Sequence, residues 1–219
     1  MAWRALRLEP ARVLLPAVVV FGLAAAEETL LVDFAEHESL WPVGVLVVIV
    51  QAVAALGLTF YAGLLDRLVG SVELGLAPPP LAGVFGTLPY LRLIVADLVV
   101  LIAVAVGTAA LVVPGLLLFT LLVIVGPVII REDRSVFDSL ARSVRLIRPH
   151  FLLALFLLTL PLLIERELID VLEVAIGHES VWQLFAAHFG VDMVFGVAIG
   201  LLEVALAERL VAASPRLTP

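Results

Sequence analysis

A series of long apolar stretches, separated by short segments in which the charged residues gather, restricts the fold of this chain more than any other feature. Most of these stretches approach the roughly 20 residues that an α-helix needs to cross a bilayer. We predict about six membrane spans, near residues 12–34, 42–65, 91–113, 114–131, 150–174 and 181–208. The predicted fold is therefore an all-α transmembrane helical bundle that forms one domain over residues 1–219.

The composition supports a membrane environment. Hydrophobic residues make up 63% of the chain and charged residues 15%, and the mean hydropathy is +1.20. A soluble domain is usually about 45 to 50% apolar with roughly 25% charge, so a soluble core of this size cannot bury so much apolar surface. The net charge of −7 argues against a nucleic-acid partner, because phosphate binding needs a concentrated basic surface.

The placement of the arginines predicts the orientation in the membrane. The 13 basic residues are all arginine, and all but Arg166 fall in the N-terminal segment, the connections 66–92 and 131–150, or the C-terminal tail. Basic residues are retained on the cytoplasmic side during insertion, which places both chain ends there. The alanine and arginine bias suggests a bacterium with GC-rich DNA, and we expect the cell (inner, cytoplasmic) membrane.

The first apolar run has two interpretations. Arginines followed by an apolar stretch and by Ala24, Ala25 and Ala26 are also typical of a cleaved signal peptide. We favour an uncleaved first span anchored by the arginines that precede it, because a multi-spanning protein can use its first span as the insertion signal.

The segment SVFDSLARSVRLIRPH predicts an amphipathic helix over residues 135–148. Ser135 and Asp138 have the spacing of a capping box, and Pro149 closes the segment. Helical spacing places apolar side chains (Val136, Phe137, Leu140, Val144, Ile147) on one face and polar ones (Asp138, Arg142, Arg145) on the opposite face. We expect this helix to lie flat in the headgroup region, with a lipid- or partner-contacting surface formed by Arg134, Arg142, Arg145 and Arg148.

Proline and glycine predict local features of the spans. Pro114 and Gly115 are expected to form a tight turn between two spans, and Pro161 is expected to kink the fifth span. Gly196 and Gly200 have the four-residue spacing of a close helix contact.

A few polar residues within the apolar runs form a candidate intramembrane site: Asp97, Gln51 and Glu203. An ionised side chain at mid-bilayer costs about 2.5 to 3.5 kcal/mol, so a charged residue there is expected to have a structural or functional role. The structural interpretation is that Glu203 and Asp97 are near-interface acids that pair with cytoplasmic arginines, Arg92 for Asp97. The functional interpretation is a proton or cation site in a small transporter or channel.

A second candidate site lies on the predicted outer face, where Glu27 and Glu28 end the first span and His188 and Asp192 sit one helical turn apart in the last. Carboxylates and imidazole can bind a divalent metal or activate water. The arrangement resembles intramembrane proteases of the CAAX-processing type. However, the arginine expected after the paired glutamates is absent, and no second histidine motif is found. The structural alternative is a solvated interfacial cluster.

The region from Val112 to Leu158 resembles the membrane domain of some glycerophosphodiester phosphodiesterases and the related YciC-like bacterial inner-membrane proteins. The matching features are Pro114 with Gly115 before a span, Pro127 near its end, Glu132 just after it, and Arg142 with Ser143 on the following helix. The resemblance implies a six-helix bacterial membrane module with a role in envelope or lipid-related processes. No soluble phosphodiesterase domain is fused here, so that activity is not implied.

Three functional hypotheses follow. The first is a non-enzymatic membrane module that contacts membrane lipids, a membrane-protein partner or a second copy of itself through the arginine-rich helix. The second is a small transporter or channel that uses Asp97, Gln51 and Glu203. The third is a metal-dependent hydrolase with the outer-face cluster. The sequence contains no complete catalytic, cofactor or metal motif, so neither a cofactor nor a bound metal ion is predicted.

Overall fold

The computed structural model describes residues 2–36, 41–177 and 180–214, and the described residues form helices and their connections without a strand. This confirms the predicted all-α fold. The elements are α1 (Ala2–Leu8), α2 (Pro10–Glu36), α3 (Trp41–Glu73), α4 (Leu81–Thr87), α5 (Tyr90–Ala110), α6 (Val112–Leu122), α7 (Val125–Glu132), α8 (Val136–Ile147), the 3-10 turn η1 (Arg148–His150), α9 (Phe151–Ala154), the π-helical turn η2 (Leu155–Thr159), α10 (Leu160–Ile176) and α11 (Val181–Ala213).

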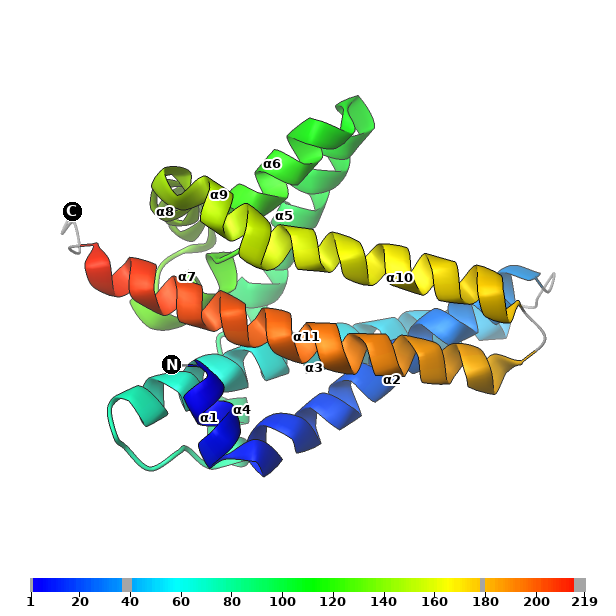
Figure 1. Cartoon of the computed structure of the whole chain (residues 1–219), viewed down its shortest axis with the longest axis horizontal. Helices are drawn as coiled ribbons and strands as arrows, with labels where there is room; N and C mark the ends of the chain where they lie inside the picture. The colour runs from blue at the N-terminus through cyan, green and yellow to red at the C-terminus, as the bar shows by residue number, and fades with distance from the viewer. Residues whose placement is uncertain (1, 37–40, 178–179, 215–219) are drawn as a thin grey trace.

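Four long helices, α2, α3, α10 and α11, run along the long axis of the molecule, and α11 packs against the other three (Figure 1). The chain start, α1, α4, α8 and the end of α11 gather at one end. We call this the arginine-rich end, since it carries Arg131, Arg134, Arg142, Arg145, Arg148 and Arg209. At the opposite end α2 leads into α3 and α10 into α11. We call it the acidic end, defined by Glu28, Glu173 and Asp192.

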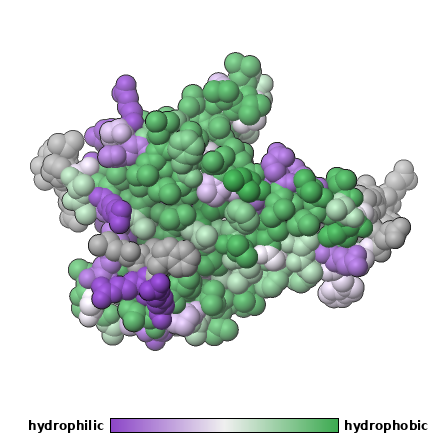
Figure 2. Space-filling view, in the orientation of Figure 1, coloured by the Kyte–Doolittle hydropathy of each residue, from purple (hydrophilic) through white to green (hydrophobic). Residues whose placement is uncertain are grey.

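Five helical stretches in the described part are long and apolar enough to cross a membrane: Pro10–Leu30, Tyr90–Ala110, Val112–Glu132, Val136–Ile176 and Val181–Ala213. The remaining predicted span falls on α3, which is 33 residues long; its side chains before Ile49 lie outside the described set. Large apolar side chains such as Leu101 and Val106 are exposed. Apolar surface dominates the middle of the molecule, and polar residues gather mainly toward its two ends (Figure 2). Exposed apolar surface on this scale is that of a multi-pass integral membrane protein.

The hairpin of α5 and α6 points away from the four long helices (Figure 1). A Cβ on Gly115 would lie 2.0 Å from the Thr108 hydroxyl oxygen, so only glycine permits this approach of the two helices. The predicted turn at Pro114 is wrong, because the chain reverses at the extended Leu111 and Pro114 lies in the first turn of α6. The first helical turn tolerates proline because its missing N–H has no intrahelical partner there.

The predicted distortion of the fifth span lies just before Pro161. The π-helical turn η2 ends at Thr159, where proline's missing N–H and its ring disturb the regular hydrogen-bond pattern. Thr159 makes a 2.9 Å hydrogen bond with Thr120 of α6. This bond ties the base of the α5–α6 hairpin to the α9–α10 helical segment.

The predicted close packing around Gly196 and Gly200 is confirmed. A Cβ on Gly196 would lie 2.4 Å from the ring of Phe21 on α2, and one on Gly200 would lie 2.8 Å from Leu65 on α3. Phe21 and Leu65 belong to the largest buried cluster, which joins α1, α2, α3, α4 and α11. The last helix is therefore held against the first two spans through the small residues of one face.

Candidate functional sites

Helix α8 begins as predicted, with the Ser135 side chain accepting a hydrogen bond from the Asp138 backbone N–H. The predicted orientation is only partly right: Ile147 is buried and Val136, Leu140 and Val144 pack against a buried cluster, as expected for the apolar face of the helix. Its buried face consists of Ser139, Arg142, Ser143, Leu146 and Ile147, while Phe137 of the predicted apolar face is exposed. The Ser143 hydroxyl donates to the Leu121 carbonyl oxygen at 2.8 Å. Small side chains allow α8 to approach α6 and α7, and this packing outweighs the burial of Phe137.

Arg142 is therefore not a surface arginine. Its Nη2 atom lies 3.2 Å from Oε1 of Glu132, and both side chains are buried. A buried guanidinium needs a carboxylate partner, and Glu132, at the end of α7, supplies it. Arg134 pairs with the other oxygen of Glu132. Two of the four predicted contact residues thus neutralise one internal carboxylate, and only Arg145 and Arg148 are exposed.

A second ion-pair group joins three helices at the arginine-rich end. The Nε atom of Arg131 on α7 donates to Oδ1 of Asp66 on α3 at 2.6 Å, and its Nη1 lies 3.7 Å from Oε1 of Glu208 on α11. Arg92 pairs with Asp133 at 2.6 Å, not with Asp97 as expected. Asp133 adopts the left-handed conformation that ends α7, and this places its carboxylate beside Arg92.

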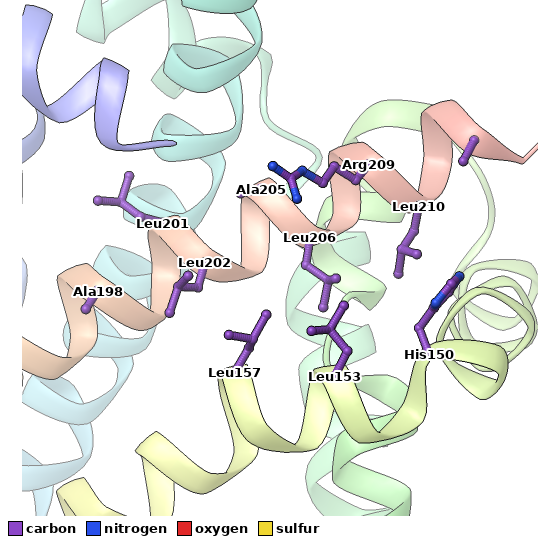
Figure 3. A pocket seen from close by; sticks show the side chains of 11 residues that line it. His150, Leu153, Leu157, Ala198, Leu201, Leu202, Ala205, Leu206, Arg209 and Leu210 are labelled. Atoms are coloured by element: carbon purple, nitrogen blue, oxygen red, sulfur yellow. The ribbon is translucent and has the colours of Figure 1, made fainter. Parts of the chain in front are cut away.

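A lateral groove of about 470 Å³ lies between the segment 150–157 and the second half of α11 (Figure 3). Its walls carry leucines and alanines of the two segments: Leu153, Leu157, Ala198, Leu201, Leu202, Ala205, Leu206, Leu210 and Ala213. The polar side chains of His150 and Arg209 complete the lining, and the Arg209 side chain extends back along α11 toward Ala205 (Figure 3). Alanines at positions 198, 205 and 213 recur on one face of α11, and their small side chains leave space along that face for the groove.

Arg209 differs from the arginines described above. Within the described part of the chain it pairs with no carboxylate, whereas Arg92, Arg131, Arg134 and Arg142 each do. Arg209 is also exposed. An uncompensated guanidinium that lines an apolar groove offers charge and directed hydrogen-bond donors to an anion. Arg145 and Arg148 add further unpaired charge at the same end of the molecule.

The structure brings together only part of the predicted intramembrane site. Glu203 on α11 interacts electrostatically with Asp97 on α5 and Asp66 on α3. The side chain of Gln51 lies outside the described set. Neither the 470 Å³ groove nor a larger apolar groove between α2, α3 and α4 is lined by Asp97 or Glu203. For the transport hypothesis, the structure therefore supplies an acidic pair, Asp97 and Glu203, near the arginine-rich end. Neither of the two described grooves leads to this pair.

At the acidic end the structure does bring Glu28 and His188 together, across three helices. The Nδ1 atom of His188 lies 2.5 Å from Oε2 of Glu28, and its Nε2 lies 3.0 Å from Oε1 of Glu173. Asp192 lies one turn along α11 and interacts electrostatically with both His188 and Glu28. Glu27 interacts with Glu28. The predicted cluster of four residues is thus a connected group centred on one buried imidazole.

Sequence reasoning missed two members of this cluster, Glu173 and Arg166, both on α10. Arg166 lies 4.0 Å from Glu28 and 3.5 Å from Asp170. Glu173 and Arg166 both lie within the predicted fifth span, near residues 150–174, but neither was included in the predicted outer-face site. The sequence did contain a signal for these two residues, because positions 166, 170 and 173 fall on one face of a helix. Among the described residues, no group of three or more His, Asp or Glu side chains is arranged to hold a metal ion.

Comparison of the chain with protein-family models, curated proteins and solved structures found no match. The resemblance of the region 112–158 to the YciC-like membrane domains therefore stays a prediction. Three residues that carry it, Glu132, Arg142 and Ser143, lie in the buried contacts between α7, α8 and α6 described above.

Proposed function

We propose that this integral membrane protein is a lipid-binding module that holds an anionic phospholipid in the groove between the segment 150–157 and α11. The observation that carries the proposal is the pairing of leucine and alanine walls with an unpaired, exposed Arg209 at one end. The occupant must be apolar along most of its length and negatively charged at one end. A phospholipid of the surrounding bilayer has that chemistry.

The position of the groove fits such an occupant. Its apolar part follows α11 through a stretch long and apolar enough to span a membrane, where acyl chains lie. Its charged part lies toward the arginine-rich end, which the placement of arginines predicts to face the cytoplasm. The volume of about 470 Å³ falls within the roughly 300–1,000 Å³ of small-molecule sites. Arg145 and Arg148 supply a general attraction to anionic headgroups, and Arg209 gives the specific contact.

Replacing Arg209 tests the charged end. The protein is reconstituted in bilayers that mix phosphatidylcholine with phosphatidylglycerol, and the lipids that stay bound are counted by native mass spectrometry. Arg209→Gln should retain about fivefold less phosphatidylglycerol, since one arginine near the surface contributes about 1 kcal/mol to anionic lipid binding. Retention of phosphatidylcholine should not change. Arg166→Gln, which removes an arginine at the acidic end, is the matched control and should retain the native amount.

Filling the groove tests the apolar part independently of charge. Ala198→Phe introduces a large ring where an acyl chain would lie, and should reduce retention of both lipids while the fold stays intact by circular dichroism. Two results would contradict the proposal: native-level retention of phosphatidylglycerol by Arg209→Gln, or retention of both lipids at the native level by Ala198→Phe.

A further inference from the structure

The imidazole of His188 is held at the acidic end between two carboxylates from different helices. Glu28 is on α2, Glu173 is on α10, and His188 itself is on α11. The His188 side chain is only 2% exposed. Nδ1 is hydrogen-bonded to Oε2 of Glu28 at 2.5 Å, whereas Nε2 lies 3.0 Å from Oε1 of Glu173 in a close charge contact that lacks hydrogen-bond geometry. This arrangement is independent of the lipid groove, which lies toward the other end of α11.

The two contacts set the protonation state of the ring. A neutral imidazole carries one N–H, and its other nitrogen presents a lone pair. A carboxylate is only an acceptor when ionised, so both contacts form together only when both ring nitrogens carry a proton. The two carboxylates therefore favour an imidazolium, which links α2 and α10 through α11 by one hydrogen bond and one charge contact. Removal of one proton leaves a lone pair facing a carboxylate, and that contact becomes repulsive.

The groups around the ring favour the imidazolium. On α2 these are Glu27 and Glu28; on α10 they are Glu165, Arg166, Asp170 and Glu173; on α11 the further group is Asp192. The side chains of α3 before Ile49 lie outside the described set. The carboxylates outnumber the single arginine, so the local charge attracts a proton.

We propose that Glu28, His188 and Glu173 form a proton-binding clamp that fastens α2 to the α10–α11 hairpin at the acidic end. With the proton bound, both contacts form and the clamp is closed. As the pH on that side rises and the proton leaves, one contact is lost and the ends of the helices separate enough to admit water. The device responds to the aqueous phase at the acidic end, predicted to be the outer side.

The absence of cysteine from the chain makes a direct test available. Thr29 follows Glu28 on α2 and is buried, so Thr29→Cys places one buried thiol next to a clamp residue in the full-length protein. Val174→Cys, at an exposed position on α10, is the reference. Both proteins are reconstituted in vesicles and labelled with a water-soluble maleimide from about pH 6 to about pH 9, around the ordinary titration range of histidine. The ratio of the two labelling rates removes the ordinary pH dependence of thiol reactivity.

The ratio for Thr29→Cys over Val174→Cys should rise about tenfold with pH, as expected when one contact of the charged imidazolium is lost. His188→Gln cannot exchange a proton, so it should make the ratio independent of pH. Glu167→Gln, an exposed change on α10 away from the ring, should behave as the native chain. A ratio that stays flat with His188 present, or a rise that persists in His188→Gln, would overturn the proposal.

A second variant covers the case in which His188→Gln does not fold. Glu173→Gln keeps the contact with Glu28 and removes one negative charge beside the ring. It should shift the rise of the labelling ratio to lower pH, because the imidazolium loses one of its partners. An unshifted rise in Glu173→Gln would exclude Glu173 from the clamp and overturn the proposal as stated.

Discussion

Arg142 and Glu132 form an ion pair whose side chains are 5% and 3% exposed. Glu132→Gln keeps the shape of the side chain but leaves Arg142 charged and without a full partner. Breaking a buried pair from one side costs about 3–5 kcal/mol, so we expect a loss of that size in the free energy of unfolding in detergent. The double variant Glu132→Gln with Arg142→Met should recover most of the loss, because the buried guanidinium is removed, while Arg134, the other partner of Glu132, is 27% exposed and can be solvated.

The exposed pair of Arg92 and Asp133 gives the matched control, with side chains 46% and 86% exposed. Asp133→Asn should change the free energy of unfolding by less than about 1 kcal/mol, since solvent screens exposed pairs. Asparagine also tolerates the left-handed backbone at this position. Equal losses in Glu132→Gln and Asp133→Asn would show that burial does not set the strength of these pairs.

Single residues also show what the sequence alone could predict. Glu28 and His188 were placed together because both fall at the same end of spans with fixed lengths. Arg142 was placed on the wrong face because large apolar residues marked the expected contact side, whereas the buried face uses Ser139 and Ser143. The partner of Arg142 lies on a separate helix, and no helical spacing within α8 reveals it.

At the scale of helices, the α5–α6 hairpin depends on Gly115. Gly115→Ala places a methyl group 2.0 Å from the Thr108 hydroxyl oxygen and 2.8 Å from its backbone nitrogen. The two helices must move apart, and overpacking of this kind costs about 1–3 kcal/mol. Thermal unfolding in detergent should register the loss.

Gly126→Ala on α7 is the control, because a Cβ there meets nothing within 4 Å. In a helix, alanine is favoured over glycine by about 0.5–1 kcal/mol, so this variant should be slightly more stable than the native chain. The two changes are chemically identical and should have opposite signs. Destabilisation by both would mean that the hairpin contact does not decide the effect.

The sequence predicted helix boundaries correctly where a local motif is compatible with only one structure. The capping residues before Val136 correctly set the start of α8, and a distortion precedes Pro161 as expected. Pro114 was misleading because proline is compatible with a turn and with a helix start alike. The predicted end of the fifth span, near residue 174, lies close to the observed end of α10 at Ile176. The contacts of Arg166 with α2 and of Glu173 with α11 were not predicted, because they depend on how α10 packs against those helices.

At the scale of the whole molecule, the two ends have different chemistry. The arginine-rich end combines internal ion pairs with unpaired arginines and the lipid groove, and the acidic end is joined through His188. The alternation of apolar runs and charged connections was sufficient to predict the fold class. The groove was not predictable, since it depends on how the segment 150–157 packs against α11.

Sided labelling of two cysteines tests the membrane arrangement most directly. Ala141→Cys on α8 and Gln183→Cys on α11 place single thiols at exposed positions of the two ends in a chain without native cysteine. In intact cells a membrane-impermeant maleimide should label Gln183→Cys and not Ala141→Cys, and in inside-out vesicles the pattern should reverse. Labelling of both positions from the same side, or release of the protein from membranes by alkaline carbonate, would contradict the account.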